Sequence, residues 1–285
     1  WVNRRGHKFN SELFASQKLQ KAGLKYTIPG KKPATDNYVL FANMKRDRSG
    51  DIEDTLWNMG VAYRDKKGNF AREFGIKWQQ EHFTVGNDSG NIGLLTPYAR
   101  FTYLRTDNPL DTHDGLLLGL TLTGAHTSVL SDTSFFQAIA DAKYIKRFGE
   151  KHKMLIGGSI GRTWTKDFHE LPASYRFFTG GDRTIRGYRF NDIGDTDSSG
   201  KNIGGNKMFY TSAEYEYFFR PKMAGAVFVD AGDAYSSGVA NIKVGAGFGF
   251  HYYSPIGPIK INLAHGFDKP GDKVRLHLSI GPELP

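Results

Sequence analysis

The stretch "VGAGFGFHY", residues 244–252, alternates between two kinds of residue at every position. Its even-numbered positions are all apolar, and its odd-numbered positions are glycine or, at 251, histidine. Successive side chains of a β-strand point to opposite faces, so a period of two predicts a strand with one apolar and one small or polar face. Because the same period recurs through most of the chain, this stretch indicates the fold class.

Working outward from this stretch, we count about fourteen alternating segments, each with an apolar face and a face too polar for a buried sandwich core. Most segments run about 9–13 residues, against a mean near 5–6 for strands of soluble proteins, and this length suits a bilayer crossing. Aromatic residues gather at segment ends, where membrane barrels carry their interfacial girdles. The segments lie near 7–17, 19–28, 37–46, 55–64, 70–82, 92–104, 115–124, 134–147, 152–164, 207–219, 225–234, 243–253, 259–265 and 273–281.

The connections between these segments alternate between tight turns and longer polar loops, which is the pattern of outer-membrane barrels. The longest segment without alternation covers residues 165–206, and we expect it to be an external loop. No shift in composition marks a domain boundary. The sequence therefore predicts an all-β fold, a transmembrane antiparallel β-barrel, as one domain over residues 1–285.

Composition limits the other classes of protein. The net charge of +9 would suit nucleic acid, but a solvated basic surface is the simpler interpretation, and we predict no nucleic-acid partner. Cysteine is absent, which excludes disulfides and thiolate chemistry. Mean hydropathy is −0.47 and no run approaches the ~18–20 apolar residues that a membrane helix needs, whereas alternating strands escape such a scan.

The motifs that would carry chemistry are missing their context. Three glycine-rich stretches, at 157–162, 180–187 and 245–250, lack the amphipathic helix that a dinucleotide fingerprint needs. The acidic and histidine residues of "DTHD" (111–114) and "DFHE" (167–170) show no ligand spacing that recurs on one face. We therefore predict no catalytic residues, no metal site and no cofactor, and a protein that is not an enzyme.

Four stretches together resemble one family. These are "FFTGGDRTIRGYRF" (177–190), "EYEYFF" (214–219), "GAVFVDAGDAY" (225–235) and the tail "SPIGPIKINLAHGF…LHLSIGPEL" (254–284). The chain is similar to the TamA family of translocation and assembly barrels, within the superfamily of BamA and the two-partner-secretion transporters. The resemblance covers essentially the whole chain, and Arg-Gly-Tyr at 186–188 within "GGDRTIRGY" is its most specific part.

The resemblance implies that the external loop folds back into the barrel lumen with the Arg-Gly-Tyr motif at its tip. Arg186 would meet acidic residues on the inner wall, and the matching positions are Glu214 and Asp230. Alternation in their own segments also places both carboxylates on the lumen face. Such an arginine would form charge-assisted bonds, with a glycine allowing close approach to the wall. The expected loop-motif lock comprises Gly180, Gly181, Asp182, Arg183, Arg186, Gly187 and Tyr188.

The resemblance also implies a function in the outer membrane of a Gram-negative bacterium. The barrel would insert or secrete unfolded β-barrel clients of the autotransporter type, with a TamB-like partner anchored in the inner membrane. A lateral seam would template client strands by β-augmentation. The seam strand expected here comprises Lys273, Val274, Arg275, Leu276, His277, Leu278, Ser279, Ile280 and Gly281.

Barrels of this family have sixteen strands preceded by polypeptide-transport-associated (POTRA) domains. Because about fourteen segments are counted from Trp1 onward, we expect this chain to be part of a longer protein that also holds the first strands. Three alternatives stay open at this point. They are a two-partner-secretion transporter that exports one exoprotein through the lumen, a general diffusion porin, and a soluble β-protein that binds sugar or nucleic acid.

Overall fold

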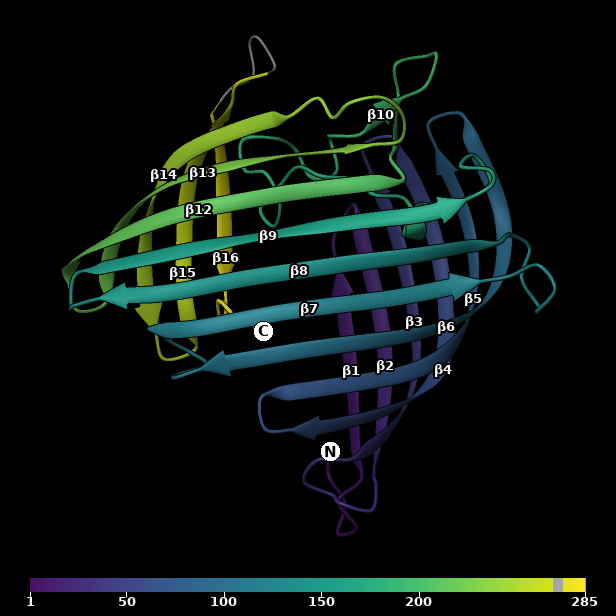
Figure 1. The fold of residues 1–285 in the computed structure, drawn as a ribbon, viewed down its shortest axis with the longest axis horizontal. Coiled ribbons are helices and arrows are strands. Elements are labelled where there is room, and N and C mark those ends of the chain that lie inside the picture. The colour runs from purple at the N-terminus through teal and green to yellow at the C-terminus, as the bar shows by residue number, and fades with distance from the viewer. Residues whose placement is uncertain (269–273, 285) are drawn as a thin grey trace.

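The computed structural model describes residues 1–268 and 274–284, and it confirms the all-β fold class. One antiparallel sheet holds fourteen strands in the order of the sequence, except that two short strands of the long loop form a sheet of their own (Figure 1). The sheet strands are β1 Lys8–Ala15, β2 Leu19–Pro29, β3 Asn37–Ser49, β4 Ile52–Lys67, β5 Phe70–Val85, β6 Asp88–Thr106, β7 Asp114–Ala125, β8 Phe135–Phe148, β9 His152–Thr165, β12 Lys207–Arg220, β13 Met223–Tyr235, β14 Lys243–Ser254, β15 Gly257–Gly266 and β16 Arg275–Ile280.

Each predicted segment coincides with one strand of this sheet, and the differences are in the boundaries. For example, β6 covers Asp88–Thr106 where the alternation predicts 92–104. Three elements inside residues 165–206 were not predicted, namely the 3-10 helix η1 (Ala173–Tyr175) and strands β10 (Asp195–Thr196) and β11 (Asn202–Gly204). They are too short to produce a periodic pattern. Lys273 of the expected seam strand lies outside the described residues.

The outer face of the sheet is apolar and exposed, while the inner face is polar and buried. On β5, the side chains of Phe74, Ile76 and Trp78 are 37–44% exposed, whereas Gln79 and Glu81 on the other face are fully buried. Soluble monomers rarely expose continuous apolar surface on this scale. The sheet therefore has the opposite polarity to a soluble sheet, with its polar side inward.

The sheet curls around an interior space that the long loop and the C-terminal residues enter. In Figure 1, β7, β8, β9 and β12 cross the front while β1–β3, β15 and β16 stand behind them. Among the described residues, β1 pairs only with β2 and β16 only with β15, so the sheet is open between its two ends. No helix in the described part of the chain is long and apolar enough to cross a membrane.

The first part of the long loop, residues 165–206, packs on the inner wall. Tyr175 of η1 is buried against Phe135, with ring centroids 4.2 Å apart, in an apolar cluster that β4, β5 and β6 complete. The backbone N–H of Ser174 donates to the buried carboxylate of Glu81 at 2.9 Å. The guanidinium of Arg176 lies 2.8 Å from a carboxylate oxygen of Asp88. These contacts fix the loop inside the sheet before it reaches the glycine-rich motif.

Candidate functional site

The glycine-rich motif forms a tight turn that brings its second half to the inner wall. Gly180 and Gly181 have φ angles of +100° and +102°, in a region that favours glycine. The N–H of Gly180 donates to the hydroxyl of Thr184 at 2.8 Å, and the N–H of Gly181 donates to the carbonyl of Ile185 at 3.0 Å. Ile185 is fully buried, so the chain after the turn is held against the wall.

Arg186 lies between the two wall carboxylates, as the resemblance implies. Its Nε and Nη2 atoms donate to the two carboxylate oxygens of Asp230 at 2.7 and 2.9 Å, which is a bidentate pair. Its Nη1 donates to Glu214 at 2.5 Å, and its backbone N–H donates to Asp230 at 3.0 Å. The guanidinium carbon also lies 3.4 Å from the ring centroid of Phe228. One side chain thus ties the loop to both β12 and β13.

The Arg186 contacts are removed from water. Arg186, Glu214 and Asp230 are only 8%, 7% and 1% exposed. Burial by itself would lower the pKa of Arg186, but its hydrogen bonds to Asp230 and the charge of Glu214 outweigh burial and raise it. The guanidinium therefore stays charged, and a buried charge of this kind is tolerated only while its partners are in place.

Gly187 permits the closest approach between the loop and the end of the sheet. Its φ is +94°, and a Cβ atom at this position would lie 2.6 Å from the backbone carbon of His265 in β15. Its N–H donates to Nε2 of His277 in β16 at 3.0 Å. The carboxylate of Asp182 contacts the other ring nitrogen of His277. The loop therefore binds the last strand directly as well as β12 and β13.

Tyr188 and Arg183 complete the predicted motif in different ways. Tyr188 is buried, and its hydroxyl lies 3.0 Å from the carbonyl oxygen of Val244 and 2.8 Å from a carboxylate oxygen of Asp268. It thus fastens the loop at the ends of β14 and β15. Arg183 is exposed and, with Asp182, faces a cavity of about 1140 Å³ inside the sheet. Arg183 is therefore the one predicted arginine of the motif that the wall does not bind.

Substitution of Gly245 tests whether the wall is shaped for the loop. A Cβ atom at Gly245 of β14 would lie 1.9 Å from the carbonyl oxygen of Arg186, a distance that no packing adjustment of a side chain relieves. We expect Gly245→Ala to displace the loop and to increase cleavage within residues 165–206 in limited proteolysis by at least tenfold. Gly225→Ala is the control, because a Cβ atom there meets nothing within 4 Å. Equal protection of the loop in the two variants would contradict the expectation.

An ion-pair network that sequence reasoning missed extends from the wall carboxylates. Lys260 of β15 lies 2.9 Å from Glu214, 3.1 Å from Glu216 and 2.8 Å from Glu283. A signal for Glu216 was present, because "EYEYFF" places it two residues after Glu214 and so on the same face. Lys260 and Glu283 gave no comparable signal, since only the register of distant strands brings them here.

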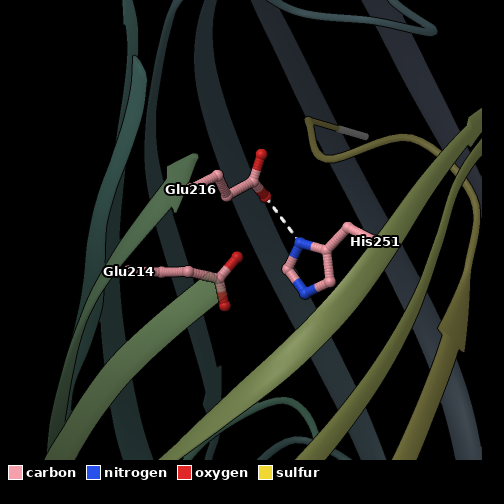
Figure 2. Close-up of side chains that lie close together, drawn as sticks. All are labelled: Glu214, Glu216 and His251. Atoms are coloured by element: carbon pink, nitrogen blue, oxygen red, sulfur yellow. Dashed lines mark hydrogen bonds and ion pairs between the residues drawn. The ribbon is translucent and has the colours of Figure 1, made fainter. Parts of the chain in front are cut away.

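Glu214, Glu216 and His251 form a buried group whose oxygen and nitrogen atoms lie within 4.8 Å of one another. Figure 2 shows the three side chains converging, with Glu216 bonded to Nδ1 of His251 at 2.7 Å. Such a set resembles a metal site, but the ammonium of Lys260 lies on the same carboxylates. A divalent cation would have to displace Lys260, so we interpret the group as an ion-pair network.

Comparison with known proteins agrees with this geometry. The family model of the Omp85 superfamily domain matches residues 3–283. The chain is 26% identical over 178 residues to the outer membrane protein assembly factor BamA of Nitratidesulfovibrio vulgaris, which covers 60% of this chain and 22% of that protein. It superposes on the crystal structure of BamA from Haemophilus ducreyi lacking POTRA domains 1–3 with a TM-score of 0.83 at 14% identity, covering 98% of this chain and 64% of that one. The chain thus spans about a fifth of the length of the curated relative.

Proposed function

The chain belongs to the Omp85 superfamily, and from this premise we propose that it is the outer-membrane barrel of a system that inserts or secretes other β-rich proteins. The exposed apolar face of the sheet is the face that lipid would cover, and its buried polar face surrounds the loop. The proposed activity makes and breaks no covalent bond. The listed BamA relative is an outer membrane protein assembly factor by name.

The observation that carries this proposal is the edge of β16. Of its two edges, only the one facing β15 is paired within the described residues, over Arg275–Ile280. An unpaired strand edge offers backbone N–H and C=O groups to which an incoming strand can add. We propose that a client strand pairs there, within the seam strand expected from the sequence.

The docked loop supports a role for the motif at this edge. Gly187 and Asp182 of the loop both contact the side chain of His277, which lies in the middle of β16. The same loop is fixed to β12 and β13 through Arg186. We propose that residues 180–188 hold the last strand in position, so that this motif acts as a lock on the seam.

Within the superfamily, we propose a TamA-type role, in which the clients are autotransporters and a TamB-like protein of the inner membrane is the partner. The loop motif and the sequence "GPEL" at 281–284 favour this role. A two-partner-secretion transporter is the alternative. Co-purification of the full-length protein with an inner-membrane-anchored protein supports the first role, and co-purification with a single secreted substrate supports the second.

The proposed function is tested by assembly of a client in proteoliposomes. Liposomes that hold the full-length protein receive a denatured autotransporter barrel, and folded client is measured as the protease-resistant, heat-modifiable form. We expect an initial rate at least tenfold above that of liposomes that hold an unrelated porin. A rate equal to that of the porin liposomes would overturn the proposal.

A further inference from the structure

The residues after β16 cross the interior of the sheet to the opposite wall. We call residues 281–284 the tail. Leu284 is 3% exposed and packs on Ile145 of β8 and Leu155 of β9, with Leu104 and Leu117 beside them. These residues lie on strands β6–β9, far along the sheet from β16. The tail thus fills an apolar socket built by the wall and not by its own strand.

Glu283 of the tail occupies a cationic site next to this socket. Its carboxylate lies 2.5 Å from Nζ of Lys153 in β9 and 2.8 Å from Nζ of Lys260 in β15. The ammonium of Lys143 in β8 donates to its backbone carbonyl at 2.9 Å. Glu283 is only 8% exposed. Charge-assisted bonds in such a place are stronger than those between surface ions.

The cationic site is held in place without the tail. Lys153 is fully buried, its ammonium donates to the hydroxyl of Tyr253 at 2.9 Å, and it lies 4.6 Å from the centroid of that ring. Lys260 is fixed by Glu214 and Glu216. When Glu283 is absent, the nearest carboxylate that the described residues offer Lys153 is Asp111, at 4.0 Å. A buried ammonium without a carboxylate is costly, so the site favours an anion.

The tail itself is held by side chains more than by its backbone. In the described part of the chain, its backbone N–H groups make one bond to other backbone, from Gly281 to the carbonyl of Pro258 at 3.2 Å. Pro282 has no N–H to donate. Unlike a sheet strand, the tail therefore leaves the wall by breaking the contacts of two side chains and no ladder of hydrogen bonds.

We propose that this wall of the lumen is an exchangeable binding site for an acidic peptide segment that reads glutamate followed by leucine, with the tail as its resident ligand. The rigid strands supply the cations and the apolar socket, and the ligand supplies one carboxylate and one aliphatic side chain. A second chain segment with this pattern competes with the tail for the same place.

The pKa of Glu283 sets the pH range of this binding. Burial would raise the pKa, but the charges of Lys260 and Lys153 outweigh burial and hold it below its usual value. A lowered pKa in the bound state means that the stabilisation is present above the ordinary pKa of about 4.3 and is lost as pH falls through the bound value. Binding should therefore be constant from pH 8 to about pH 5.

The test uses the full chain with the site vacated by Glu283→Gln and Leu284→Ser, which leave every residue of the wall in place. The probe is a fluorescein-labelled peptide of residues 279–285, SIGPELP, followed by fluorescence anisotropy in detergent. The control probe is SIGPQLP, and heat-modifiability on gels establishes that the variant is folded. We expect saturable binding of SIGPELP, at least tenfold tighter than that of SIGPQLP, and weaker binding of SIGPELP to the unaltered chain.

A second variant separates recognition from general folding effects. Adding Lys153→Glu to the vacated chain should weaken SIGPELP at least tenfold and favour SIGPKLP, whose charge is reversed. The proposal is overturned if folded, vacated chain binds neither peptide saturably. It is equally overturned if SIGPELP and SIGPQLP bind alike, or if Lys153→Glu leaves the order of the peptides unchanged.

Discussion

Replacement of Arg186 by alanine should release the long loop from the lumen wall. The change leaves the carboxylates of Asp230 and Glu214 buried without the cation that joins them to the loop. Removing one partner of a buried ion pair costs about 3–5 kcal/mol, and less where water enters. Since proteolysis tracks the population of the open form when opening is fast, cleavage within residues 165–206 should rise by roughly a hundredfold.

The matched control for this prediction is Arg183→Ala. Arg183 belongs to the same loop, is exposed, and is likewise a cleavage site for trypsin. Both variants thus lose one arginine of the same segment, but only Arg186 binds the wall. Asp230→Ala should act in the same direction as Arg186→Ala. The account is wrong if trypsin cleaves the Arg186→Ala and Arg183→Ala loops at the same rate.

Replacement of Lys260 by methionine should destabilise the barrel as a whole. Lys260 is the cation that Glu214, Glu216 and Glu283 share, and methionine fills its volume without its charge. With about 3–5 kcal/mol lost, we expect the temperature at which the folded band disappears on SDS gels to fall by roughly 6–20 °C. Lys222→Met is the control, because Lys222 is exposed in the turn between β12 and β13. An unchanged transition temperature for Lys260→Met would remove the network from the account.

The period of two predicted the sheet because the two faces of each strand meet different surroundings. In β14, apolar Val244, Ala246 and Phe248 face outward while Gly245 and Gly247 face the interior, and this contrast is present in the local sequence. The same reasoning placed Glu214 and Asp230 on the inner wall. Their contact with Arg186 came from family resemblance, since local pattern does not say which wall a loop reaches.

The rest of the site depends on register across several strands, which no local pattern encodes. Lys260 meets Glu214 across 46 residues of chain, and Glu283 meets Lys153 across 130. These contacts exist only because the sheet curls and brings the tail to β8 and β9. The fold of the long loop was unpredictable for a related reason. Its helix η1 and strands β10 and β11 are stabilised by packing on the wall and not by their own periodicity.

The central claim is that a loop docked through Arg186 holds the seam in a state that assembles clients. The most direct measurement is the initial rate of client assembly in proteoliposomes that hold full-length Arg186→Ala or full-length Arg183→Ala protein. The account predicts that Arg186→Ala loses at least tenfold in rate while Arg183→Ala keeps the rate of the unaltered protein. Assembly by Arg186→Ala at the unaltered rate, with its loop shown by proteolysis to be released, would contradict the claim.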